Sequence, residues 1–236
     1  MRLGIMQPYF FPYIGYFSLI KHVDKFILLD DVQFIRHGWI ERNRILKPTG
    51  GWQYIAVPLR KHDQTTRIKD IEIKNEIDWK QKILAQLVHY KRAPYYREVI
   101  QVLEEIFRKE YNTITELNAA ALRVSTHYLG IDTPIEIFRE MDVRIGEVTS
   151  PDEWALNICK ALPGVDEYWN PPGGKTFFNP SKYEDNGIKL RFEKANITEY
   201  TQNGSFFEPG LSIIDVMMFN SPEKINRMLD DYVLCE

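Results

Sequence analysis

Three segments of the chain carry the residue types that could bind or transform a polar substrate. The first, residues 7–17, follows a short apolar run and opens a helical pattern. Such a loop lies where open parallel sheets bind ligands and where helix N-termini attract anions. Its candidate substrate-binding residues are Gln7, Pro8, Tyr9, Tyr13, Gly15 and Tyr16. The alternative is that its many aromatic side chains simply form core.

The second segment, residues 30–44, begins with two adjacent carboxylates at the end of an apolar run. A buried charge must be paired, so this placement is unusual for stability alone. We expect Asp30 or Asp31 to act as a base or as an acceptor for sugar hydroxyls, and we add His37 as a catalytic candidate. The candidate substrate-binding residues are Gln33, Trp39, Arg42, Asn43 and Arg44, of which the arginines would hold phosphates. The alternative is a surface ion-pair network.

The third segment is Asn-Pro-Pro-Gly-Gly-Lys at residues 170–175. Gly173 and Gly174 could offer backbone amides to an anion, and Lys175 adds a positive charge. The spacing is not that of a Walker A loop, and a plain turn is the alternative. We expect no metal site, because the histidines are scattered without ligand spacing.

The elements that must position these segments follow an α/β pattern. Residues 3–6 and 25–30 are short apolar runs, and residues 14–23 between them have helical spacing. Strand, helix and strand in that order predict a βαβ unit and a parallel sheet. Further strands are predicted at residues 135–140, 165–169 and 188–192, and helices after Ser150, at 212–220 and at 221–232.

The middle of the chain has a different pattern. Residues 44–48 and 52–59 flank Thr-Gly-Gly and predict a hairpin, and the alternation at residues 67–74 predicts a third antiparallel strand. Three helices follow, the last with a capping box from Thr113 to Glu116 and a stop at Gly130. We therefore expect one domain spanning residues 1–236, a Rossmann-like parallel sheet built from about 1–44 and 131–236. Residues 45–130 would form an inserted β-hairpin and helical subdomain.

Composition narrows the function. The 236 residues carry 30 Lys+Arg against 33 Asp+Glu, a formal net charge of -3, so nucleic acid is not expected as a main ligand. The apolar share of 44% is enough for a core and excludes general disorder. With two cysteines and no apolar run of about eighteen residues, we expect a cytoplasmic protein without a membrane span.

Five stretches together resemble the WbqC-like family, over essentially the whole chain. They are MQPYFFPYIGYF (6–17), DDVQFIRHGWIERNRI (30–45), WQYIAVPL (52–59), NPPGGK (170–175) and GLSIIDVMMFNSP (210–222). The resemblance implies a role in O-antigen or related surface-polysaccharide biosynthesis, and glycine transfer onto an amino sugar has been proposed for some members. Where members carry His-Pro before a late Tyr-x-Gln, this chain has Ile197-Thr198-Glu199.

A fainter resemblance is to the nucleotidylyltransferase α/β superfamily. Those enzymes place His-x-Gly-His at the helix N-terminus to bind ATP phosphates, whereas this chain has Tyr13-Ile14-Gly15-Tyr16. Tyrosine brings no positive charge near pH 7. The resemblance therefore supports the predicted fold. Because both histidines are missing, we rank an ATP-dependent adenylate-forming ligase below the other candidate functions.

We expect an acyl or aminoacyl transferase that acts on the amine of a nucleotide-linked amino sugar. No resident cofactor is expected, but an activated acyl or aminoacyl donor would be needed, and an acyl carrier is a candidate partner. The alternative is a non-catalytic protein that binds a sugar nucleotide or scaffolds the glycan machinery. The sequence leaves the oligomeric state open.

Overall fold

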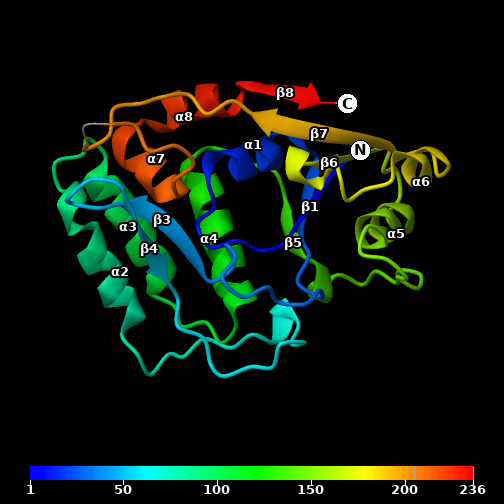
Figure 1. Cartoon of the computed structure of the whole chain (residues 1–236), viewed down its shortest axis with the longest axis horizontal. Helices are drawn as coiled ribbons and strands as arrows, with labels where there is room; N and C mark the ends of the chain where they lie inside the picture. The colour runs from blue at the N-terminus through cyan, green and yellow to red at the C-terminus, as the bar shows by residue number, and fades with distance from the viewer. Residues whose placement is uncertain (205, 236) are drawn as a thin grey trace.

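The computed structural model describes residues 1–204 and 206–235, and its centre is a six-stranded sheet (Figure 1). The strand order is β5-β2-β1-β6-β7-β8, with all neighbours parallel except β7 and β8, which pair antiparallel. The bounds are β1 (Arg2–Met6), β2 (Lys25–Leu28), β5 (Ile135–Ile137), β6 (Glu167–Asn170), β7 (Lys189–Ala195) and β8 (Tyr232–Cys235). The expected α/β fold with a parallel sheet is thus confirmed.

The first βαβ unit forms as its sequence predicts. β1 lies in the middle of the sheet between β2 and β6, which explains why its apolar run is continuous rather than alternating. The helix that follows, α1 (Ile14–His22), buries most of its length and leads directly into β2.

Helices cover both faces of the sheet. The larger hydrophobic cluster joins one face to α1, α4, α7 and α8, and the smaller cluster joins the other face to α5 and α6. Among the described residues there are eight α-helices: α1, α2 (Trp79–Leu87), α3 (Tyr96–Phe107), α4 (Ile114–Tyr128), α5 (Glu153–Ala161), α6 (Pro180–Glu184), α7 (Ile213–Phe219) and α8 (Pro222–Leu229). None of the helices described is long and apolar enough to cross a membrane.

The elements between β2 and β5 include the hairpin of β3 (Arg42–Leu46) and β4 (Trp52–Ala56), which confirms the hairpin prediction. Gly50 and Gly51 in its turn both have positive φ, a region that favours glycine. In Figure 1 the hairpin lies with α2 and α3 beyond α4, on the side away from α5 and α6. Its buried side chains belong to the same cluster as those of α1 and α7. The subdomain boundaries near residues 45 and 130 stay predictions.

One predicted strand is wrong. Residues 67–74 form a short 3-10 turn, Ile68–Asp70, followed by isolated bridges instead of a strand. Ile68, Ile71 and Ile73 are all buried. Since Ile68 and Ile71 are three residues apart, a regular strand would point them to opposite faces, whereas the turn brings both inside. The sequence analysis also missed α6 and β8.

The helix caps follow the sequence closely. Thr113 and Glu116 form the expected capping box of α4, and Gly130 adopts a φ of 69° where that helix ends. The helix predicted after Ser150 begins at Glu153, whose carboxylate accepts hydrogen bonds from the amides of Thr149 and Ser150.

A buried carboxyl on β7 connects the sheet to α1. The side chain of Glu193 is 1% exposed, and its Oε1 lies 2.5 Å from Ser18 Oγ. That hydroxyl has a single proton and also lies 2.8 Å from the carbonyl oxygen of Leu229, a pure acceptor. Ser18 therefore donates its one proton either to Glu193 Oε1 or to the carbonyl oxygen of Leu229. Burial raises the pKa of Glu193 to about 7.

We expect Glu193→Gln to stabilise the protein at pH 8 and to change little at pH 5. The folded-state pKa lies above the ordinary value of 4.5, so Glu193 costs stability progressively as pH rises from about 4.5 to 7. The neutral amide removes a cost of about 3 kcal/mol, or several degrees in melting temperature. Thermal unfolding at both pH values measures this.

The control for this prediction is Glu104→Gln on the exposed face of α3. The titratable side chains that face Glu193 are those of His22, Tyr13 and Tyr232. His22 Nδ1 lies 3.9 Å from Glu193 Oε2, and His22 in turn contacts Asp230. An equal gain for Glu193→Gln at pH 5 and pH 8 would contradict the prediction.

Candidate functional site

A cavity of about 670 Å³ lies at the carboxyl ends of β1 and β6. In the strand order, β2 lies on one side of the β1–β6 pair and β7 lies on the other. The connection that follows β1 and the connection that follows β6 therefore run in opposite directions. Open α/β sheets bind ligands at such a switch point. The lining comes from Met6, Tyr9, Pro12 and Tyr13; from Trp39, Asn43 and Arg44; from residues 170–174; and from Ile197, Pro209 and Gly210. All three segments singled out in the sequence meet here.

The loop after β1 is held by side chains that donate to its backbone carbonyl groups. Two prolines keep residues 7–13 out of regular structure, and a buried carbonyl without a partner is costly. Four side chains supply the donors: Tyr16 Oη to Gln7 (2.8 Å), Asn118 Nδ2 to Pro8 (2.9 Å), Asn43 Nδ2 to Phe10 (3.0 Å) and Phe11 (2.9 Å), and Ser212 Oγ to Phe11 (2.8 Å). They hold Phe11 at a φ of 39°, unusual for a residue other than glycine.

The residues predicted in this loop fall into two groups, those that line the cavity and those that do not. Tyr9 and Tyr13 line the cavity, and burial raises the pKa of both hydroxyls, which therefore stay protonated donors. Gly15 is buried, and a Cβ on it would lie 2.5 Å from the ring of Tyr13, so it makes room for that ring. Gln7, Pro8, Gly15 and Tyr16 do not line the cavity.

Arg44 is the cation of the cavity. Its guanidinium carbon lies 5.4 Å from the ring centre of Trp39 and 5.2 Å from that of Trp52, within range of cation–π attraction. Nη2 donates to the carbonyl of Gly210 at 3.2 Å, and Nε is buried without a hydrogen-bond partner. Among the described residues no carboxylate forms an ion pair with it. The cavity therefore holds a positive charge that has no carboxylate partner among the residues described.

The other predicted cations lie elsewhere. Arg42 donates from Nη2 to the carbonyl of His37 at 2.5 Å and stacks 4.2 Å from the ring centre of Tyr54. His37 is exposed with a φ of 62°, and Lys175 is exposed beyond the turn Pro172–Gly174. None of the three lines the cavity, whereas Gly173 and Gly174 do.

The paired carboxylates lie outside the cavity. Asp30 is fully buried and accepts from the amide of Arg139 at 3.2 Å, with Arg139 Nε 3.4 Å from its second oxygen. Burial raises the pKa of Asp30 to about 6. Partial burial also acts to raise the pKa of Asp31, but hydrogen bonds from Lys69 and Arg67 outweigh it and hold that pKa low.

Gln33 is likewise outside the cavity, on an exposed loop where its amide donates to the carbonyl of Gln64 at 2.8 Å. The catalytic role of Asp30, Asp31 and His37 stays a prediction.

The sequence analysis missed the cavity wall formed by Ile197, Pro209 and Gly210. Asp215 is fully buried and accepts hydrogen bonds from Tyr90 Oη (2.6 Å), Tyr200 Oη (2.6 Å) and Gln202 Nε2 (2.9 Å). Burial raises its pKa. Gln202 also bonds the backbone of Glu208 in both directions, which positions the cavity-lining Pro209 and Gly210. The Tyr-x-Gln pattern at 200–202 was visible in the sequence, but its partner was not.

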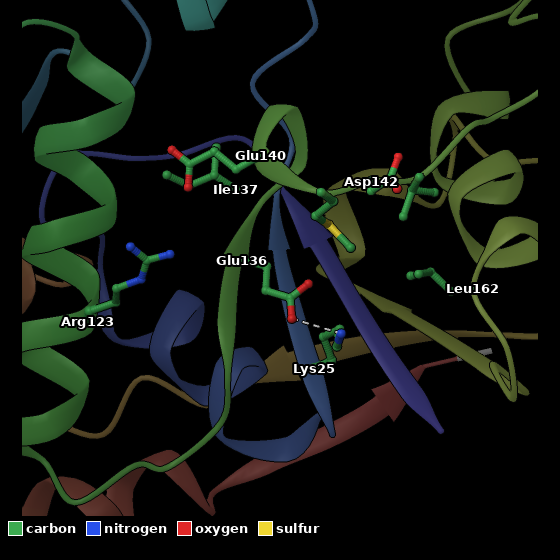
Figure 2. A pocket seen from close by; sticks show the side chains of 9 residues that line it. Lys25, Arg123, Glu136, Ile137, Glu140, Asp142 and Leu162 are labelled. Atoms are coloured by element: carbon green, nitrogen blue, oxygen red, sulfur yellow. Dashed lines mark hydrogen bonds and ion pairs between the residues drawn. The ribbon is translucent and has the colours of Figure 1, made fainter.

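A second hollow, of about 440 Å³, lies beside the edge strand β5 (Figure 2). Lys25 and Glu136 on neighbouring strands form an ion pair at 2.9 Å, drawn as the dashed line in Figure 2. Arg123 donates from Nη2 to the carbonyl of Ile135 at 2.8 Å and so covers part of the sheet edge. Lys25, Glu136 and Arg123 thus have partners within the fold, and we assign this hollow no function.

Fold and site together define a doubly wound α/β protein with a ligand-sized cavity, which contains the guanidinium of Arg44, at the switch point of its sheet. The chain belongs to the WbqC-like protein family, whose model matches residues 7–227. It is 30% identical over 223 residues to "Uncharacterized protein Rv1507c" of Mycobacterium tuberculosis (strain ATCC 25618 / H37Rv), covering 93% of each chain. No solved structure matches it significantly. The family resemblance seen in the sequence is confirmed, and membership fits a role in polysaccharide biosynthesis.

The Gly-Gly turn yields a stability prediction with a built-in comparison. A Cβ on Gly174 would lie 2.5 Å from Asn170 Oδ1 and 2.7 Å from the ring of Phe178, whereas one on Gly173 would meet nothing within 4 Å. We expect Gly174→Ala to cost about 1–3 kcal/mol through overpacking and Gly173→Ala to cost under about 0.5 kcal/mol. Melting temperatures of the two variants measure the difference, and equal values would show that the turn is not packed as described.

Proposed function

We propose that this protein is a transferase of O-antigen or related surface-polysaccharide biosynthesis. It binds a nucleotide-linked amino sugar in the switch-point cavity and moves a glycyl or other acyl group onto the sugar amine. The observation that carries the proposal is the guanidinium of Arg44, held between Trp39 and Trp52 without a carboxylate partner among the described residues. A diphosphate is the kind of group that such a cation binds.

The rest of the cavity supports this class of ligand. Its volume lies in the range of about 300–1,000 Å³ usual for small-molecule sites. Tyr9, Tyr13 and Trp39 give apolar faces and hydroxyl donors suited to a sugar or a base. Gly173 and Gly174, in the loop that follows β6, bring backbone to the cavity.

The proposed reaction forms an amide from an activated ester or thioester. The sugar nitrogen attacks the acyl carbon, the new C–N bond forms, and the bond from that carbon to the carrier oxygen or sulfur breaks. The base takes the proton from the amine and passes it to the leaving oxygen or sulfur, so that the carrier leaves as alcohol or thiol. Positioning of amine and carbonyl supplies much of the rate in such a step. A base supplies more, and Asp30, Asp31 and His37 are our candidates for it.

The second candidate function is non-catalytic binding of a sugar nucleotide, for delivery or scaffolding. One observation favours it: among the described residues that line the cavity there is no carboxylate and no imidazole. Binding needs only the cation and the aromatic faces, whereas amine acylation also needs a proton acceptor. Product formation separates the two functions.

We expect Arg44→Gln to weaken binding of UDP- or dTDP-linked amino sugars by at least about tenfold, since it removes a partly buried cation from the phosphates. Isothermal titration calorimetry at two salt concentrations measures this, and the loss of affinity with salt should be smaller in the variant. Arg97→Gln, on the exposed side of α3, is the matched control. Equal affinities of Arg44→Gln and the wild type would contradict the proposed site.

With an activated glycyl or acyl thioester added, we expect the wild type to produce the N-acylated sugar nucleotide, detected by mass spectrometry. Asp30→Asn and Asp31→Asn test the base. A loss of rate of at least about 100-fold with unchanged sugar-nucleotide affinity is expected for the residue that takes the proton. Unchanged rates would remove both residues from the mechanism, and binding without any product would leave the binding function alone.

A further inference from the structure

Asn170 is a polar side chain of the cavity that the proposed function does not yet use. It is the last residue of β6, lines the cavity and is 8% exposed. The carboxamide of such a buried asparagine should have partners for both its oxygen and its nitrogen. Among the residues that the structure describes, hydrogen-bond partners are found only for the nitrogen.

The neighbours of Asn170 determine which way its amide points. Nδ2 lies 2.6 Å from Tyr168 Oη and 3.7 Å from Met6 Sδ. Burial raises the pKa of Tyr168 far above its ordinary value, so the phenol keeps its proton, and that proton points to the carbonyl of Ile5 at 3.4 Å. The hydroxyl of Tyr168 is therefore free to accept, and the sulfur of Met6 can only accept. Both neighbours are acceptors for the NH2 group of Asn170, so Oδ1 points away from them.

Oδ1 faces the Gly-Gly turn and has no donor. A Cβ on Gly174 would lie 2.5 Å from it, so the glycine leaves the space that this oxygen occupies. No described residue donates a hydrogen bond to it. The amide oxygen of a cavity-lining residue that has no donor among the described residues is suited to a donor on the ligand.

We propose that Asn170 determines specificity by accepting a hydrogen bond from the amino group of the sugar. This inference rests on the proposed function and deepens it, because it orients the ligand. A phosphate oxygen is a hydrogen-bond acceptor and cannot bond to Asn170 Oδ1, which is also an acceptor. The phosphates therefore lie towards Arg44 and the amine towards β6. A protonated or neutral amine donates, and a sugar that lacks a donor at this position leaves Oδ1 unpaired.

The test compares three probes on the wild type and on Asn170→Leu by calorimetry: UDP, UDP-glucosamine and UDP-2-deoxyglucose. We expect the wild type to bind UDP-glucosamine at least about tenfold more tightly than UDP-2-deoxyglucose. In Asn170→Leu that ratio should fall to about one while the affinity for UDP stays the same. A ratio that persists in the variant, or is absent in the wild type, overturns the inference and leaves the nucleotide site intact.

A second measurement needs no variant. The side-chain NH2 of Asn170, assigned in the wild type through its contacts to the Tyr168 ring, should shift in ¹⁵N-correlated NMR spectra with UDP-glucosamine and not with UDP-2-deoxyglucose. If UDP itself fails to bind, the proposed nucleotide function fails. In that case the free sugars glucosamine and 2-deoxyglucose are compared by the same resonance. Equal shifts with these two sugars would overturn the inference.

Discussion

The structure depends on how the buried, proline-stiffened loop after β1 satisfies its carbonyl groups. Residues 7–13 make no ladder, yet they lie under the cavity and against the main core. Asn43 of β3, Asn118 of α4 and Ser212 at the N-cap of α7 donate to this one loop. Each of these side chains comes from a different element, so the hairpin, α4 and α7 must all be in place before the loop can hold its shape.

Several carboxylates of the protein have their partners within the fold. Asp31 and Asp215 contact arginine, lysine, tyrosine or glutamine side chains. The guanidinium of Arg44 and the amide oxygen of Asn170 are left with unused capacity, and both line the switch-point cavity. Unsatisfied polar groups cost stability, and natural proteins keep them mainly where a ligand completes them. Arg44 and Asn170 are therefore our candidates for the groups that a ligand completes.

Local patterns predicted the fold well because their causes are local. The apolar runs of β1 and β2, the capping box at Thr113 and the glycines of the hairpin turn need no distant partner to be recognised. The site was predicted only as three converging segments. Whether Arg42 or Arg44 points into the cavity depends on Tyr54 and Trp52, and the importance of Asn170 depends on Tyr168 and Met6. The partners of Asn118 and Asp215 are long-range contacts without a sequence pattern.

One turn of α7 ties the parts of the cavity together. Ser212 donates from its amide to the carbonyl of Arg44 and from its hydroxyl to that of Phe11, so it aligns the cation with the loop beneath the cavity. Asp215, on the same turn, holds Gln202 and through it the wall at Pro209 and Gly210. Gly210 in turn accepts from Arg44. Because the wall, the loop and the cation share this one turn, it fixes their positions relative to one another.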